Sequence, residues 1–212
     1  MTPQLVTASG VHDPTSGGGK QGGPEKWASL GELKGLEGGA KFTMVDGGTY
    51  DPDKAYKCCC SRSNAGIGGL CSAHLTPPPS PRPHRRRDSK LCNMLFMAEA
   101  ARRWGGGGLT ANAFSPGLIA DPKGFFRNQN PKFAAVFNSI SRAAGVAETN
   151  DFAGSALAYL AVDPAMEGKT GGWYDALPLG KHSLAKHPPS VEAQDVAKQK
   201  KLWELSEKLV RA

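Results

Sequence analysis

A tyrosine and a lysine flank an unusual stretch of this 212-residue chain. Tyr56 precedes and Lys90 follows residues 58–87, which are rich in cysteine, proline and arginine. If 58–87 is set aside, Tyr56 and Lys90 fall four positions apart, on one face of a helix. An ammonium there would favour the phenolate and lower a pKa that is ordinarily about 10, so the tyrosine could exchange a proton near neutral pH. Many helices have this spacing by chance, so it is a weak signal alone.

Three further features follow one another along the chain. "PQLVTAS" (3–9) predicts a short buried strand that ends in Ser9. Apolar residues at 3.6 spacing predict a helix over 89–104, which would carry Lys90. Residues 109–117 alternate and end in Ser-Pro-Gly, as a strand entering a loop does. Neither feature needs a function: Ser9 could be a strand-end serine bonded to backbone, and Pro116-Gly117 could be an ordinary strand-ending turn.

The rest of the chain continues to alternate helix and strand. We predict helices over 131–145, over 152–163 with Thr149 or Asn150 as its cap, and over 189–210 with Ser190 as its cap. The apolar face of the last helix would hold Val196, Leu202, Trp203 and Leu209, and 171–178 should contain a short strand. Alternation of this kind indicates an α/β protein with a mostly parallel sheet.

Composition excludes some functional classes. No run of about 18 apolar residues is present, so we expect no membrane span, and "MTPQLVTASG" does not have the features of a signal or transit peptide. Five arginines and no acidic residue fall in 58–87, which therefore holds most of the net charge of +7. A nearly neutral remainder argues against a nucleic-acid partner. Cys92 is the one cysteine outside 58–87, which argues against a disulfide framework.

Residues 58–87 have several interpretations. A zinc site lacks the C-x2-C spacing that presents two thiolates to one metal, although the segment has Cys58, Cys59, Cys60, Cys71 and His74. "TPPPSPRP" could be a polyproline ligand, and "RPHRRR" could bind nucleic acid or an acidic partner. We favour a disordered insertion that is translated non-coding sequence, such as a retained intron. Transcripts joining Lys57 directly to Asp88 would support this hypothesis, and transcripts that all contain the segment would count against it.

Four segments carry a specific resemblance: "AYK" with "DSKLCNML", "SPGLIA", "GFFRNQNPKF" and "DVAKQKKLWELSEKLV". Together they resemble the C-terminal half of the light-dependent protochlorophyllide oxidoreductases, which are short-chain dehydrogenase/reductases. The resemblance implies an incomplete Rossmann-like fold that lacks the N-terminal nucleotide-binding strands. It divides the chain into the start of that half at 1–57, the insertion at 58–87 and the remainder of the reductase domain at 88–212.

The resemblance also implies roles for individual residues. Tyr56 would be the catalytic proton source, and Lys90 would lower the pKa of that phenol and contact the nicotinamide ribose. Ser9 would orient the reacting group. Pro116 and Gly117 would turn backbone groups toward the nicotinamide.

Four more residues would lie on the pigment side. Cys92 matches a family cysteine near the pigment, with packing as the alternative, because one cysteine on an amphipathic helix is commonly buried filler. Phe125, Phe126 and Arg127 match a segment that covers the pigment, and aromatic rings suit a flat macrocycle, with core packing as the alternative. No metal site is expected.

The activity implied is light-driven reduction of protochlorophyllide by NADPH in a plastid. The resemblance leaves room for a homo-oligomer and for peripheral association with plastid membranes. No glycine-rich phosphate turn follows a strand here, since the four glycines at 105–108 precede one. We therefore expect little or no activity from this chain, and the alternative is a non-catalytic remnant that binds pigment or a partner reductase chain.

Overall fold

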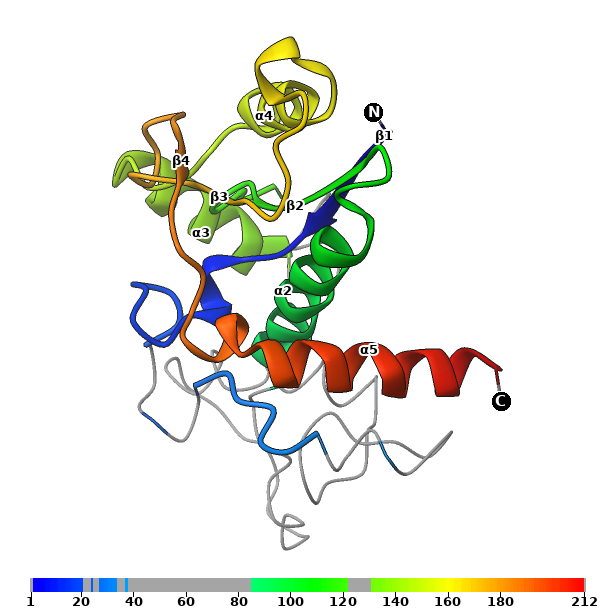
Figure 1. The fold of residues 1–212 in the computed structure, drawn as a ribbon. Helices are drawn as coiled ribbons and strands as arrows, with labels where there is room; N and C mark the ends of the chain where they lie inside the picture. The colour runs from blue at the N-terminus through cyan, green and yellow to red at the C-terminus, as the bar shows by residue number, and fades with distance from the viewer. Residues whose placement is uncertain are drawn as a thin grey trace, which may run out of the picture.

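The computed structural model describes residues 2–20, 24, 27–33, 37, 85–121 and 131–211, and all structural statements below concern these residues. Figure 1 shows helices around a small sheet. The elements are β1 (Thr2–Thr7), a 3-10 turn η1 (Gly10–His12), α2 (Arg85–Trp104), β2 (Leu109–Ser115), α3 (Pro131–Ala143), α4 (Asn150–Val162), η5 (Pro164–Met166), β3 (Trp173–Ala176), β4 (Leu184–Lys186), η6 (Glu192–Gln194) and α5 (Val196–Arg211).

The sheet has the order β1-β2-β3-β4. β1 and β3 flank β2 and both run parallel to it, whereas β4 returns antiparallel to β3. The central strand β2 is buried along nearly its whole length, as expected of a parallel strand covered on both faces. The predicted α/β class with a mostly parallel sheet is therefore confirmed, and the arrangement is that of part of a Rossmann-like fold. The short strand β4 was not predicted.

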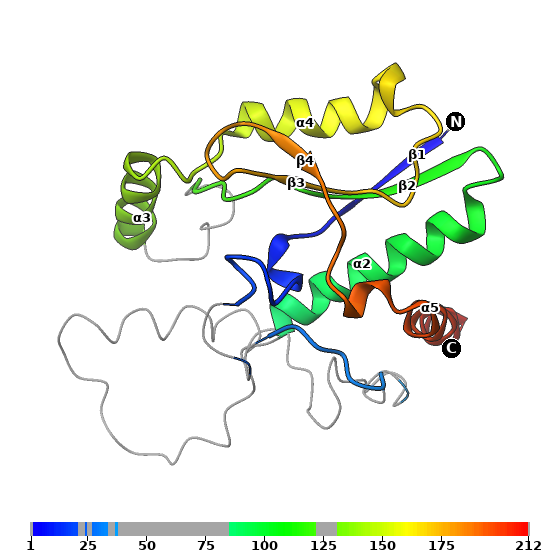
Figure 2. The ribbon, with the colours of Figure 1, turned by 60° about the vertical axis from the view of Figure 1, so that its left-hand side comes forward.

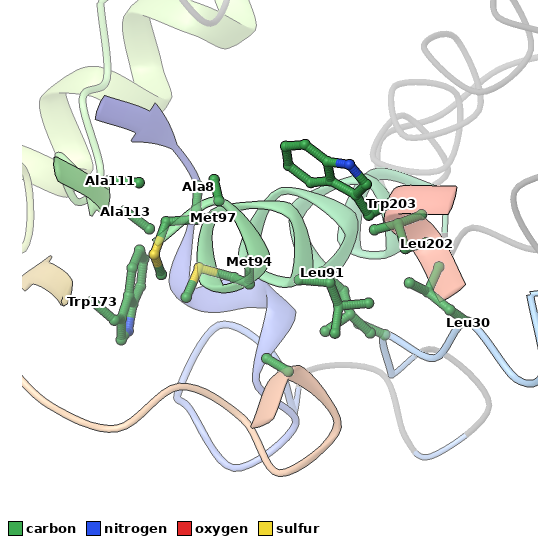
Figure 3. Close-up of a cluster of buried hydrophobic side chains, with 14 of the residues drawn as sticks. Ala8, Leu30, Leu91, Met94, Met97, Ala111, Ala113, Trp173, Leu202 and Trp203 are labelled. Atoms are coloured by element: carbon green, nitrogen blue, oxygen red, sulfur yellow. The ribbon is translucent and has the colours of Figure 1, made fainter. Parts of the chain in front are cut away.

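Helices cover both faces of the sheet, as the view along its edge shows (Figure 2). α4 lies on one face, and α2 lies on the other with α5 packed outside it. The larger core cluster surrounds α2 (Figure 3): Met94 and Met97 lie on the side of Trp173 of the sheet, and Leu91 lies toward Leu30 and Leu202. The smaller cluster, beneath α4, contains Phe114, Ala156, Leu160, Met166 and Tyr174.

Helix α2 matches the predicted apolar stripe. Leu91, Met94 and Leu95 are buried in the larger core cluster, because their 3.6 spacing places them on one side of the helix. The helix begins at Arg85, four residues before the predicted start and inside the range 58–87. It ends at Trp104, and the glycine turn that follows leads into β2 as expected. Gly108 has a φ of +83°, a value that favours glycine.

The caps were predicted with mixed success. Thr149 caps α4, because its side chain accepts a hydrogen bond from the amide of Phe152 at 3.1 Å. The prediction that Ser190 caps the last helix is wrong. α5 begins at Val196, and Asp195 Oδ1 accepts from the amide of Lys198 at 3.0 Å.

Ser190 instead accepts from the amide of Ala193 at 3.4 Å, in the short turn before α5. The predicted apolar face of α5 is right for Leu202 and Trp203, which are buried, and wrong for Val196, which is 47% exposed. None of the described helices is both long and apolar enough to cross a membrane.

Candidate functional site

Three parallel strands bring their carboxyl ends together, and the candidate site lies at this edge. Ligands of open α/β sheets bind outside that edge. β1 ends opposite β2 with Thr7 beside Phe114, and the amide of Ala8 extends the pairing with a 2.8 Å hydrogen bond to the carbonyl of Phe114. The residue that follows is Ser9.

Ser9 begins the 3-10 turn η1. Its side chain accepts a hydrogen bond from the amide of Val11 at 3.5 Å, so the alternative of a serine bonded to backbone describes part of what it does. A hydroxyl that accepts this bond still has its own hydrogen to donate. Ser9 is half-buried, so the turn holds a hydroxyl donor at the edge of the sheet.

Pro116 and Gly117 follow the end of β2. Gly117 has a φ of +75°, and a Cβ atom there would stand 2.8 Å from Glu148 Cγ and 2.9 Å from Ala176 Cβ. Glycine is therefore required both by the backbone conformation and by the space. The turn therefore passes close to Ala176 of β3.

Glu148 holds this turn against the β3–β4 connection, and sequence reasoning missed it. Its side chain is fully buried, and Oε1 accepts from the amide of Gly180 at 2.6 Å. Oε2 accepts from the amide of His182 at 3.2 Å and contacts His182 Nδ1 at 2.5 Å. The amide of Glu148 donates to the carbonyl of Leu118 at 2.8 Å, which ties the carboxylate to the loop of Gly117.

Helix α2 carries Lys90 toward the same edge. Asn93 Nδ2 donates to the carbonyl of Thr7 at 2.9 Å, which fixes this part of α2 beside the end of β1. Lys90 lies three residues earlier, one turn along on a similar side of the helix, and is half-buried. In Figure 2 this first half of α2 lies beneath the end of β1 and the turn that follows.

Cys92 follows Lys90 by two positions and therefore lies on a different side of α2. It packs against the larger core cluster. Burial, followed by the charges of Asp88 and Glu192, raises the pKa of the Cys92 thiol to about 12. The group is therefore a neutral thiol at physiological pH, which supports the packing alternative for this residue.

A buried polar group beneath the edge was also missed. Asp175 of β3 is 7% exposed, and burial raises the pKa of its carboxyl, against a hydrogen bond with Ser115 that lowers it. His187 Nε2 lies 3.9 Å from Asp175 Oδ2. A Cβ atom on Gly10 would stand 2.9 Å from that oxygen, so the turn after Ser9 packs directly on Asp175. The sequence did contain a signal for this residue, because Asp175 is the one acid in the otherwise apolar strand of "GGWYDALP".

The structure thus brings Ser9 and the Pro116-Gly117 turn together at one edge, with Lys90 on the adjoining helix. Tyr56, Phe125, Phe126 and Arg127 lie outside the described residues. The pairing of Tyr56 with Lys90 stays a prediction.

The chain resembles known proteins in sequence. The chain is 34% identical over 189 residues to a chloroplastic protochlorophyllide reductase of Cucumis sativus, a match that covers 86% of this chain and 39% of that protein. It is 33% identical over 191 residues to protochlorophyllide reductase A of Arabidopsis thaliana, covering 86% and 38%. The chain is homologous to part of the protochlorophyllide reductases. The match agrees with the resemblance to their C-terminal part.

The chain spans about two-fifths of the length of these protochlorophyllide reductases. No protein-family model matches it. Among solved structures, a putative uncharacterized protein from Mycobacterium Paratuberculosis aligns with a TM-score of 0.49 and 17% identity, over 100% of this chain and 51% of that one.

Proposed function

We propose that this chain carries part of the site of a light-dependent NADPH:protochlorophyllide reductase, in which Tyr56 is the proton donor and Lys90 adjusts its pKa. The observation that carries the proposal is the placement of Ser9, the Pro116-Gly117 turn and Lys90 around one edge of a parallel sheet. These are the positions that the family resemblance assigns to the reaction centre.

The described residues fit the nicotinamide end of NADPH. The half-buried Lys90 ammonium can donate to ribose hydroxyls, and the turn at Gly117 presents backbone groups at the edge where nucleotides bind in such sheets. When bound, NADPH would supply a hydride. This chain's own part is to orient the acceptor through the Ser9 hydroxyl and to deliver a proton from the Tyr56 hydroxyl, with Lys90 stabilising the phenolate left behind.

The substrate class follows from the relatives, which are named for protochlorophyllide and described as chloroplastic. We infer a plastid location and a flat tetrapyrrole substrate, with Phe125 and Phe126 on the pigment side. Homo-oligomerisation and peripheral attachment to plastid membranes belong to the same proposal.

A second candidate is a non-catalytic chain that binds pigment or a partner reductase chain. One feature favours it: 58–87 separates Tyr56 from Lys90, so one continuous helix cannot place the phenol and the ammonium one turn apart. Binding of a macrocycle does not need that pair. We accordingly infer slow turnover at most for the intact chain.

The two candidates are separated by one flash experiment. The full chain is mixed with NADPH and protochlorophyllide, illuminated, and followed by the chlorophyllide absorption band. Turnover that is lost in Tyr56→Phe and in Lys90→Met, but kept in a Glu204→Gln control on the exposed side of α5, would support the reductase. Pigment binding without turnover would favour the second candidate, and absence of both would refute the two together.

A further inference from the structure

One fully buried titratable side chain has no part in the function proposed above. His12 is 0% exposed and lies at the end of the turn η1 that Ser9 begins. A buried imidazole needs partners for both ring nitrogens, because an unmet polar atom in the interior costs free energy. Both partners are present: one lies three residues before His12 and the other 178 positions after it.

The two partners determine which nitrogen carries the proton. His12 Nδ1 lies 2.7 Å from the carbonyl oxygen of Ser9, and a carbonyl can only accept. The amide of Ser190 points at His12 Nε2 across 3.3 Å, and a backbone amide can only donate. The ring must therefore be neutral, with the proton on Nδ1 and a bare Nε2. A second proton on Nε2 would face the Ser190 amide donor to donor.

The surroundings favour the same neutral state. Trp173 packs its ring edge-on against His12 at a centroid distance of 5.1 Å. Burial lowers the pKa of His12, while the hydrogen bond to Ser9 raises it. The titratable groups that act on the ring are Asp13 and Asp175, which raise the pKa, and His187, which lowers it.

We propose that His12 is a positioning residue for Ser9, which it holds through Nδ1 while Nε2 anchors the turn to the segment that precedes α5. The inference rests on the proposed function only for what the Ser9 hydroxyl does. The carbonyl of Ser9 accepts from both the amide of His12, at 3.1 Å, and the imidazole. With its carbonyl held twice, the serine has little freedom to rotate its backbone.

The second contact links the site to the C-terminal part of the chain. Ser190 lies two residues before η6 and six before α5, and its own side chain accepts from the amide of Ala193. Movement of this segment would shift the Ser190 amide that bonds to Nε2, and through His12 it would shift the turn that carries Ser9. His12 thus gives the C-terminal helix an influence on the hydroxyl at the edge of the sheet.

Two substitutions each remove one of the two hydrogen bonds of the His12 ring and keep the other. In His12→Asn the side-chain amide nitrogen stands about where Nδ1 does, so the bond to Ser9 is kept and the bond to Ser190 is lost. In His12→Gln the side-chain oxygen reaches about as far as Nε2, so the bond to Ser190 is kept and the bond to Ser9 is lost. The pair is matched because both side chains are neutral amides.

Amide hydrogen exchange and ring nitrogen-15 shifts, measured on the full chain, test the proposal without any need for turnover. We expect a protonated Nδ1 and a bare Nε2 at neutral pH. His12→Gln should speed exchange about tenfold at Val11, whose amide donates to the Ser9 hydroxyl, and His12→Asn should do so at Ser190. The opposite tautomer, or Val11 exchange that is unchanged in His12→Gln, would overturn the proposal.

Flash turnover adds the functional readout. A displaced Ser9 should lower kcat by about 100-fold in His12→Gln with little change in KM, and His12→Asn should recover most of that loss. Equal turnover in the two variants would overturn the positioning role. A wild-type chain without turnover refutes the proposed function alone, and the exchange and tautomer results then decide the positioning of Ser9.

Discussion

Replacing Glu148 tests whether one buried carboxylate holds the Gly117 turn to the β3–β4 connection. Its side chain is 0% exposed and accepts from the amides of Gly180 and His182 and from the His182 ring. Glu148→Ala removes the acceptor from all of these donors at once. Glu148→Gln keeps one carbonyl oxygen and changes the other acceptor into a donor that faces donors.

The size of the effect follows from the number of contacts. A hydrogen bond to a charged group contributes about 1.5–3 kcal/mol, and water can replace part of this at Gly180 and His182 because the loop is partly exposed. We therefore expect Glu148→Ala to lower the free energy of unfolding by about 3 kcal/mol and Glu148→Gln by about 1.5 kcal/mol. With about 2–4 °C of Tm per kcal/mol, the losses are about 6–12 °C and 3–6 °C.

Thermal unfolding followed by circular dichroism measures these shifts, with Glu204→Ala on the exposed side of α5 as the control. Hydrogen exchange at Gly180 adds a local readout, because its amide loses its acceptor in Glu148→Ala. A Tm within about 2 °C of wild type in Glu148→Ala would refute the reasoning, since exposed substitutions stay within about 0.5 kcal/mol. Equal losses in Glu148→Gln and Glu148→Ala would show that the retained oxygen contributes nothing.

The remaining predictions concern the core, the turn and pH. Leu91→Ala should cost about 2–5 kcal/mol in urea unfolding, because the side chain is 0% exposed, whereas Val210→Ala, 88% exposed, should be neutral. Gly117→Ala should cost about 1–3 kcal/mol, since φ is positive and a Cβ meets Glu148, and Gly106→Ala, where nothing lies within 4 Å, is its control. The lowered pKa of His12 means that the unfolded chain binds more protons below pH of about 6.5, so stability should fall as pH falls. His12→Gln has no imidazole here, so its free energy of unfolding should fall less between pH 7 and 5 than that of the wild type. A difference in unfolding free energy between wild type and variant that stays constant over this range would contradict the prediction.

Local patterns were enough to predict the longer helices and most of the strands, although not β4. The stripe of Leu91, Met94 and Leu95 repeats at the helical period, and each of these residues is buried in α2. The cap at Thr149 is equally local, because the amide that it accepts lies three residues away. Predictions from neighbours in sequence succeed where the partner is also a neighbour in sequence.

The missed contacts join segments that no local pattern relates. Glu148 and His182 are 34 positions apart, and His12 and Ser190 are 178 positions apart. A single buried acid or histidine in a loop forms no repeating pattern in the sequence. Its partner can be identified only when the folded structure brings the two segments together. The wrong cap has a different, local cause: Ser190 has the right residue type, but the chain makes an extra 3-10 turn before α5 begins.

The start of α2 is held by its own tertiary contacts, and this bears on the segment 58–87. The amide of Ser29 donates to Asp88 Oδ1 at 3.1 Å, and Arg87 Nη1 donates to the carbonyl of Gly19 at 2.7 Å. These contacts hold the N-terminal end of α2, which carries Lys90. Deleting 58–87 forfeits the Arg87 contact but keeps that of Asp88, and it makes Tyr56 and Lys90 neighbours on one helical face. We expect the deletion chain to turn over protochlorophyllide faster than the intact chain under identical flashes; turnover that stays the same in a folded deletion chain would show that separation of this pair is not what limits the reaction.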